Sequence, residues 1–319
     1  MRRIPGFVAA AVAVIGLWAT GAAAQDFPSR AITLIVPYAP GGAVDGTARM
    51  LAIELTKTLG QTVVVENKPG AAGMIGVVQL KRAAADGHTI LIDTPAIVMN
   101  LAIHRKPQYE AADLAPVAQV MQMPYVVAMG PTVGSSYQDL VARMKSAPSG
   151  LNVASSGTSS RLFAELFALQ TGTRFVHIGY PGAAPALMSV MKDETQITAM
   201  DVPNIEPFIT SGRLKGAVIT GNRRSTTLPE VPSAAEVGIP GFDAATWYGI
   251  FAPAQTPAAV LERLNGALRQ VTRTPAMATF MGARGAQPVD QSVAEFGAFY
   301  RSEVERWRAV IEKAGIELQ

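Results

Sequence analysis

The chain has 319 residues, of which 49% are apolar and 16% charged, with a formal net charge of +3 and no cysteine. This much apolar material can build a sizeable core, which argues against a disordered or fibrous protein, and the length predicts two lobes of about 150 residues each. The lack of cysteine excludes disulfides and thiolate sites, and His88, His104 and His177 are too far apart in sequence for a local metal motif. We expect no metal and no cofactor, and the small, evenly spread charge argues against nucleic-acid binding.

The N-terminus has the pattern of a secretory signal. Met1-Arg2-Arg3 precedes an apolar run over residues 7–18, and Ala22-Ala23-Ala24 forms a small-residue cleavage site. The run is too short for a membrane anchor, which needs about 20 apolar residues. We therefore expect residues 1–24 to be cleaved off and the mature chain to be exported.

The mature chain repeats one pattern: a short β-branched run, a glycine- or serine-rich turn, and an amphipathic helix. Such alternation predicts parallel strands in an α/β lobe. The first series comprises strands Ile32–Tyr38, Thr62–Asn67 and His88–Asp93, and helices Gly46–Leu59 and Gly73–Ala85.

A second series follows Pro148-Ser149-Gly150 and predicts a second α/β lobe. Its strands are Leu151–Ser155, Phe175–Tyr180, Gln196–Asp201 and Leu214–Thr220, and its helices are Ser159–Thr171, Ala183–Lys192 and Ile205–Ser211.

Two strand-like segments, Tyr125–Met129 and Trp247–Ala252, fit neither series, and each leads into a proline. We interpret them as crossovers between the lobes. This predicts that residues 25–124 and 247–319 form lobe 1 and that residues 125–246 form lobe 2.

The C-terminal third is predicted to be helical over Pro257–Arg273, Pro275–Met281 and Ser292–Ala314. The last helix carries an aromatic and apolar stripe at spacings of three and four, which we expect to pack against the first lobe. The stripe consists of Phe296, Phe299, Tyr300, Val304 and Trp307.

Two loops are candidates for ligand binding, because each follows the first strand of its lobe and opens a helix. Glycines bring backbone close to a ligand, and the free N–H groups and dipole of a helix start favour an anion. Ligands of open α/β sheets gather at the carboxyl ends of the strands, so both loops would face one cleft. The alternative is that each loop is only a tight turn with a capping side chain. The candidates are Tyr38, Ala39, Gly41, Gly42 and Asp45 in the first loop, and Ser155, Ser156, Thr158, Ser159 and Arg161 in the second.

Charged side chains add three further features. Arg161 in the first turn of a helix opposes the helix dipole unless an anion lies nearby, although Glu165 four residues later offers a partner instead. Asp93 and Asp201 each close a predicted strand. A carboxylate there accepts a ligand's hydroxyl or amine, or caps the next helix.

His177 raises the alternative of a hydrolase. Ser155 or Ser156 would be the nucleophile, His177 the base and Asp201 the orienting acid. The spacing does not support this triad, and a hydrogen-bonded structural histidine is the simpler interpretation. Gly70, Gly73 and Gly76 imitate a dinucleotide fingerprint, but their spacing differs from the required one.

Motifs along essentially the whole mature chain resemble those of the substrate-binding receptors of tripartite tricarboxylate transporters, the Bug family of periplasmic solute-binding proteins. They are Ile35–Gly42 (IVPYAPGG), Val64–Gly73 (VVENKPGAAG), Ala85–Thr89 (ADGHT), Ala154–Thr158 (ASSGT), Leu228–Ser233 (LPEVPS) and Thr246–Pro253 (TWYGIFAP).

The resemblance implies an α/β periplasmic binding protein of the two-lobed, type II-like venus flytrap class with two crossover strands. It implies that a small organic carboxylate is held by the two loops, that His177, Tyr180 and Asp201 shape the distal end of the site, and that the ligand passes to a membrane permease. We expect a monomer in the periplasm. A ligand sensor that docks to a signalling partner remains the alternative.

The chain departs from the family pattern in its second loop, which is two residues shorter and carries Arg161 where a histidine is common. Asp201 is followed by Val202 rather than asparagine, and Tyr180 by Pro181-Gly182 rather than lysine-glycine. We hypothesise that Arg161 makes a direct cationic contact with the ligand.

Overall fold

The computed structural model describes residues 27–318, so the predicted signal segment 1–24 lies outside the described residues. In the first lobe, β1 (Ile32–Val36) pairs in parallel with β2 (Val63–Asn67) on one side and with β3 (Thr89–Asp93) on the other. α1 (Ala43–Leu59) connects β1 to β2, and α2 (Met74–Lys81) connects β2 to β3. The first predicted series is therefore confirmed within a few residues.

The second lobe repeats this arrangement. β5 (Leu151–Ser155) lies between two parallel neighbours, β6 (Phe175–Gly179) and β7 (Ile197–Asp201). The remaining elements of this lobe are α4 (Tyr137–Ser146), α5 (Thr158–Thr171), α6 (Ala183–Met191), α7 (Val202–Thr210) and β8 (Lys215–Ile219).

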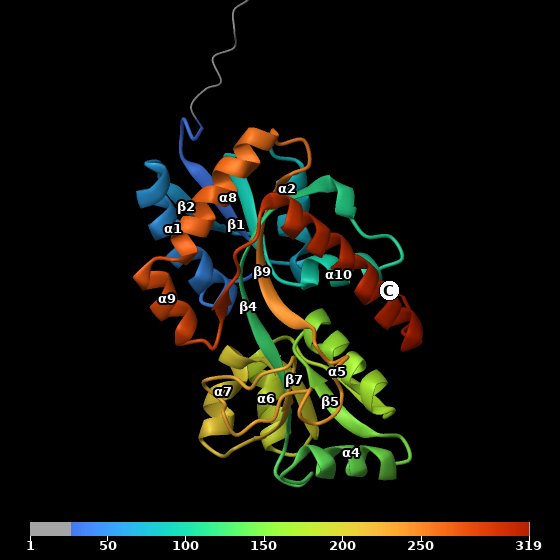
Figure 1. Ribbon diagram of the computed structural model, residues 1–319. Helices are drawn as coiled ribbons and strands as arrows, with labels where there is room; N and C mark the ends of the chain where they lie inside the picture. The colour runs from blue at the N-terminus through green and yellow to red at the C-terminus, as the bar shows by residue number, and fades with distance from the viewer. Residues whose placement is uncertain (1–26, 319) are drawn as a thin grey trace, which may run out of the picture.

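Two antiparallel strands connect the lobes. β4 (Leu114–Met129) pairs with β9 (Ala245–Pro253) in the first lobe, and its last residues pair with β7 and β8 in the second. Figure 1 shows the two lobes one above the other, with β4 and β9 running between them. One sheet thus passes through both lobes in the order β2-β1-β3-β9-β4-β7-β5-β6. The predicted α/β fold with two crossover strands is confirmed.

β4 begins well before the predicted crossover at Tyr125. Pro116 and Pro124 argue against a central strand in the sequence, because proline lacks the N–H that a ladder needs. In the structure Pro116 lies at an irregularity in the pairing with β9, and Pro124 lies where β4 exchanges β9 for the strands of the second lobe. Both prolines are therefore placed where the ladder is interrupted.

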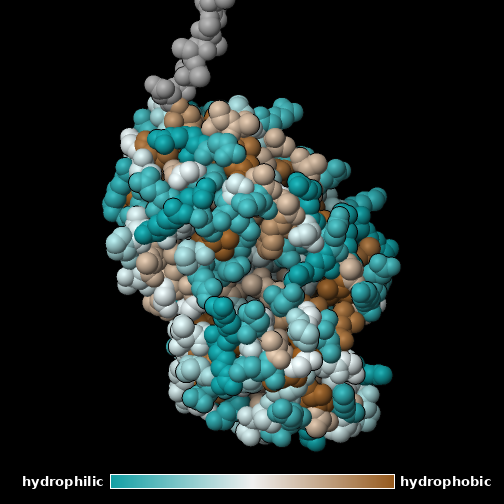
Figure 2. All heavy atoms as spheres, in the orientation of Figure 1, coloured by the Kyte–Doolittle hydropathy of each residue, from teal (hydrophilic) through white to brown (hydrophobic). Residues whose placement is uncertain are grey.

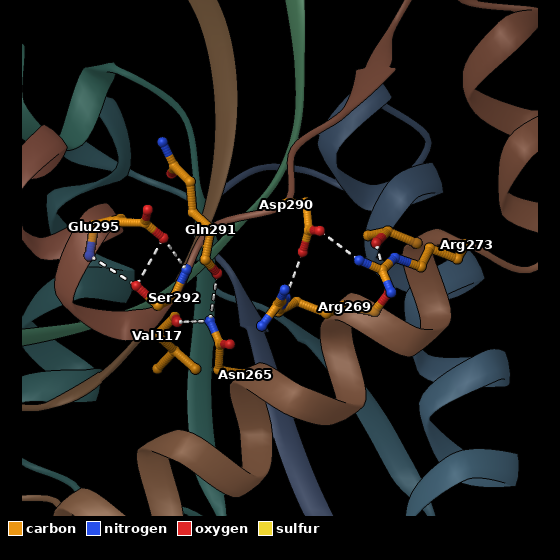
Figure 3. A network of polar contacts seen from close by, with 9 residues as sticks. Val117, Asn265, Arg269, Arg273, Asp290, Gln291, Ser292 and Glu295 are labelled. Carbon is orange, nitrogen blue, oxygen red and sulfur yellow. Dashed lines mark hydrogen bonds and ion pairs between the residues drawn. The ribbon is translucent and has the colours of Figure 1, made fainter.

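The C-terminal elements return to the first lobe. They are α8 (Ala258–Thr272), α9 (Pro275–Gly282), the short β10 (Gln287–Pro288) beside β4, and α10 (Val293–Lys313). The start of α10 is tied down by a polar network (Figure 3), in which Asn265 of α8 donates to the carbonyl oxygens of Val117 on β4 (2.8 Å) and of Gln291 (3.1 Å). Asp290 also accepts hydrogen bonds from Arg269 of α8 and from Arg273, the residue that follows this helix.

The stripe of α10 packs as expected but reaches further than predicted. Phe296 and Tyr300 contact Phe251 of β9. Trp307, however, packs against Phe163 of α5 in the second lobe, with ring centroids 5.2 Å apart. Figure 1 shows α10 (red) running from the first lobe towards α5. The helix therefore packs against both lobes.

Two helices were not predicted, α4 and α3 (Ala96–Ile103). Every residue of α3 is buried, so its sequence lacks the alternation of apolar and polar faces that marks a surface helix. Among residues 27–318, no helix is long and apolar enough to span a membrane, and no cluster of three or more acidic or histidine side chains is arranged to hold a metal ion.

Candidate functional site

The first loop is held in shape by Asp45. Its buried carboxylate accepts hydrogen bonds from the backbone N–H of Gly41 (2.9 Å), from Arg49 (2.9 and 3.0 Å) and from the side-chain amide of Asn67 (2.9 Å). The bonds from Arg49 are the main reason why the pKa of Asp45 falls to about 2. Asp45 therefore organises the loop, and its carboxylate is already engaged.

The first turn of α1, which follows this loop, has no capping side chain. Gly42 is the N-cap residue and supplies no side-chain hydrogen bond to the first turn. Ala39, Gly41 and Gly42 are exposed. The first N–H groups of a helix have no partner within the helix, so this end offers donors to an anion.

Tyr38 connects the first loop to the end of β3. Its hydroxyl donates to Asp93 Oδ1 at 2.7 Å and lies 3.1 Å from Thr94 Oγ1. Burial raises the pKa of Asp93 to about 7 and that of Tyr38 well above its usual range. Tyr38 of the first loop therefore binds Asp93 at the end of β3, and the Asp93 carboxyl is almost completely buried.

The second loop also opens a helix without a capping side chain. Gly157 is the N-cap residue of α5 and has φ +151°, a backbone conformation that residues with a side chain rarely adopt. Ser156, Thr158 and Ser159 are half-buried or exposed around it, while Ser155 is buried. The hydroxyl groups and the free N–H groups of α5 gather at this one point.

Asn100 of α3 links the second loop to the first lobe. Thr158 Oγ1 donates to Asn100 Oδ1 at 3.3 Å, and Asn100 Nδ2 donates to the carbonyl oxygen of Ala72 at 2.9 Å. Ala72 has a left-handed backbone (φ 53°), as does Ala71 (φ 47°), which costs energy in a residue other than glycine. The neighbouring Gly73 lies against Pro37 and the Tyr38 hydroxyl. The start of α5 therefore contacts α3 of the first lobe, and α3 contacts the segment Ala71–Gly73 that lies against Tyr38.

Arg161 lies on the first turn of α5. Its Nε is 3.8 Å from Glu165 Oε1 and makes no hydrogen bond to a described residue, and 22% of its side chain is exposed. Burial and the nearby Arg161 charge lower the pKa of His177, so the imidazole is neutral at neutral pH. Arg161 is thus a cation whose acidic neighbour, Glu165, lies beyond hydrogen-bond distance of its Nε.

The triad that was weighed as an alternative is not assembled. His177 Nε2 lies 2.5 Å from Ser155 Oγ, with donor and acceptor set by the histidine tautomer. Asp201 instead accepts a hydrogen bond from Asn204, and its strand lies on the opposite side of β5 from that of His177. Asp201 therefore does not orient His177, in line with the simpler interpretation of a structural histidine.

Tyr180 and Asp201 are the other two residues expected at the distal end of the site. Tyr180 follows β6 and Asp201 ends β7, and these strands lie on opposite sides of β5. Tyr180 donates its backbone N–H to the Ser155 carbonyl oxygen at 2.8 Å, while its side chain packs against the apolar core beside α6. Asp201 pairs in register with Tyr125 of β4, and burial raises its pKa. Tyr125 stacks on Phe163, with ring centroids 3.8 Å apart.

Sequence reasoning missed Asn100, Tyr125 and Tyr248 as members of this region. Asn100 belongs to a helix that was not predicted. Asp201 contributes to raising the pKa of both tyrosines, so the two rings and this carboxylate are near neighbours at the crossover strands. No local motif marks them, because strands distant in sequence bring them together.

Residues 47–316 match the family described as "Tripartite tricarboxylate transporter family receptor". The chain is similar to Protein BugT of Bordetella pertussis, with 32% identity over 325 residues that cover 100% of this chain and 99% of that protein. Among solved structures, R. palustris Rpa4515 with adipate is 29% identical, covers 92% of this chain and 99% of its own, and has a TM-score of 0.82. MatC (Rpa3494) from Rhodopseudomonas palustris with bound malate is 28% identical, covers 89% and 100%, and has a TM-score of 0.78.

Proposed function

The chain belongs to the tripartite tricarboxylate transporter receptor family, and we propose from this premise that it is a periplasmic receptor for a small organic carboxylate. The proposal rests on two helix starts without a capping side chain, one in each lobe, and on the contact of the α5 start with Asn100 of the first lobe. Each start offers unpaired N–H donors and a partial positive charge to an anion. Relatives of this fold hold adipate and malate.

The carboxylate would be bound by donors rather than by covalent chemistry. Backbone N–H groups at Gly42 to Val44 and at Thr158 to Ser159 would contact its oxygens, with Ser156 adding a hydroxyl group. Arg161 would add a charge-assisted contact at the start of α5. The lobes 25–124 plus 247–319 and 125–246 would close on the ligand by bending at β4 and β9.

We propose that the receptor acts as a monomer and passes its ligand to the permease of a tripartite transporter. The large apolar side chains that remain exposed come from several different elements, among them Ile53, Ile75 and Met188. Figure 2 shows separate hydrophobic areas on a mainly hydrophilic face. Scattered apolar residues are normal on a monomer surface.

The hydrogen bond between Ser155 and His177 favours a second candidate, a serine hydrolase. Against it, Ser155 is only 2% exposed, and the carboxylate expected to orient His177 is bound elsewhere. We therefore propose that the pair positions the second loop. A hydrolase would turn over model esters and lose this activity in Ser155→Ala, whereas a receptor would show none in either form.

A thermal-shift screen across small carboxylates tests the function directly, because a ligand that binds only the folded state raises the apparent stability. We expect a subset of mono- and dicarboxylates to raise the melting temperature, and uncharged amides of the same acids to have no effect. No shift with any carboxylate would contradict the proposal.

A further inference from the structure

Asp93 is a buried acceptor that the protein satisfies only in part. Its side chain is 1% exposed. Oδ1 accepts hydrogen bonds from the Tyr38 hydroxyl and from the backbone N–H of Thr94, both at 2.7 Å. Oδ2 accepts none from residues 27–318. A buried carboxylate oxygen without a donor is costly, so a donor from outside the chain would be stabilising here.

The surrounding hydrogen bonds all run towards Asp93. Ala96 N–H donates to Thr94 Oγ1, the Thr94 hydroxyl is left to donate to the Tyr38 oxygen, and the Tyr38 hydroxyl donates to Asp93. Within the part of the chain that the structure describes, these donors are therefore committed and none is directed at Oδ2. In the ionised form of Asp93 this oxygen can only accept. Burial raises the pKa of this carboxyl and so favours its protonated form, and a hydrogen-bond donor on a ligand would favour the ionised form.

The position of Asp93 places this acceptor beside the proposed carboxylate site. Ile35 of β1 pairs with Leu91 of β3, so Asp93 stands next to the first residues of the loop that leads into α1. Neighbouring strands are about 4.8 Å apart. Tyr38 of the first loop also donates to Asp93, so this carboxyl lies one hydrogen bond away from the loop that leads into α1.

We propose that the ligand carries a hydrogen-bond donor, an amino or hydroxyl group, one or two carbons from its carboxylate, and that Asp93 binds this donor. The inference rests on the proposed function and specifies the class of acid, namely amino or hydroxy carboxylates rather than unsubstituted ones. Asp93 is then the residue that determines specificity, with Tyr38 and Thr94 as its positioning residues.

Calorimetric titration with matched acids tests this inference. Three series differ only at one substituent: succinate, malate and aspartate; glutarate, 2-hydroxyglutarate and glutamate; 3-phenylpropionate, phenyllactate and phenylalanine. In at least one series, we expect the hydroxy or amino member to bind the wild-type chain at least tenfold tighter than the unsubstituted acid.

Asp93→Asn gives the decisive variant. The introduced asparagine side chain must turn its oxygen towards the Tyr38 and Thr94 donors, which leaves its NH₂ group facing the ligand. The preference for a donor should then fall to threefold or less, or reverse in favour of the unsubstituted acid. Glu262→Gln, which removes an exposed carboxylate on α8, should leave the preference unchanged.

Two outcomes would overturn the inference, and they are distinguishable. If unsubstituted acids bind the wild-type chain within threefold of every substituted partner, or if Asp93→Asn keeps the wild-type ratio, the role of Asp93 is wrong while the carboxylate receptor stands. If none of the acids in these series or in the wider carboxylate screen binds, the proposed function fails and this inference fails with it.

Discussion

Thr158 and Asn100 form a hydrogen bond of 3.3 Å between the first turn of α5 in the second lobe and α3 in the first lobe. Asn100 also holds the strained backbone at Ala72, beside the loop that contains Tyr38. The contact therefore links the start of α5 to α3 and, through Ala72, to the segment beside Tyr38.

Thr158→Val should weaken ligand binding by about 2- to 10-fold, because it removes one neutral hydrogen bond worth roughly 0.5–1.5 kcal/mol while keeping the shape. Calorimetry with the tightest-binding acid measures the change. Thr210→Val, at a surface position of α7, is the matched control and should leave affinity unchanged. Equal affinities in both variants would show that the contact between the lobes does not contribute.

Gly157→Ala should destabilise the second loop. At φ +151° a side chain introduces backbone strain of roughly 1–3 kcal/mol, although nothing within 4 Å blocks a methyl group. Gly46→Ala is the matched control, because Gly46 lies inside α1 with equal space, and alanine there should stabilise by about 0.5–1 kcal/mol. Denaturant unfolding distinguishes the two, and equal effects of the same sign would contradict the assignment.

Arg161→Ala should lower carboxylate affinity by roughly 1.5–3 kcal/mol, the usual cost of losing a charge-assisted hydrogen bond. Glu165 is too far away to form a hydrogen bond with Arg161 Nε, so Glu165→Ala should change affinity much less. Titration calorimetry of both variants provides the comparison. If Arg161→Ala left the affinity unchanged, this result would contradict the proposed contact between Arg161 and the ligand.

The pKa of Asp93 predicts a pH dependence of folding. Burial raises it from 3.8 to about 7, so the folded chain prefers the protonated form. The other titratable groups whose pKa values Asp93 helps to raise are Tyr38, Tyr109 and Tyr300, which are neutral below pH 10. The contribution of protonated Asp93 to stability is complete below about pH 3.8 and is lost as the pH rises through about 7.

Consequently, the free energy of unfolding of the wild type relative to Asp93→Asn should fall between pH 5 and pH 8. Urea titrations at the two values, with Glu262→Gln as the control, measure this difference. A constant difference would mean that Asp93 titrates near its ordinary pKa.

Trp307→Ala should destabilise the chain by about 3–5 kcal/mol, because the indole is fully buried between α10 and Phe163 of the other lobe. Trp307→Phe keeps most of the packing and should cost much less. Denaturant unfolding measures both variants. A small loss in Trp307→Ala would show that α10 does not couple the lobes.

Much of this fold could be predicted from local patterns. β5 (Leu151–Ser155) was predicted to the residue, because a short, mainly apolar run between Gly150 and the serine-glycine turn is a local signal. For β4, only the part from Tyr125 onward was predicted. Its prolines lie where the pairing of β4 is interrupted, and these interruptions become visible only once the partner strands are known. α3 was not predicted, because all of its residues are buried and its sequence therefore has no polar face.

The proposed site combines features that the sequence shows with contacts that only the fold shows. The two glycine- and hydroxyl-rich loops were visible because each opens a helix after a strand. The engagement of Asp45 by Arg49 and Asn67, and the link from Thr158 to Asn100, depend on contacts between elements that the fold brings together. Contacts of this kind cannot be deduced from the spacing of residues in the sequence. The sequence alone therefore could not show that Asp45 is fully hydrogen-bonded while one oxygen of Asp93 has no donor among the residues that the structure describes.

The central claim is that the starts of α1 and α5 bind one carboxylate together. A crystal structure of the chain with its tightest-binding acid tests this most directly. We expect a carboxylate oxygen at about 2.7–3.2 Å from N–H groups in the first turns of both helices. An acid bound outside the junction of the lobes, or held by only one of the two helix starts, would contradict the account.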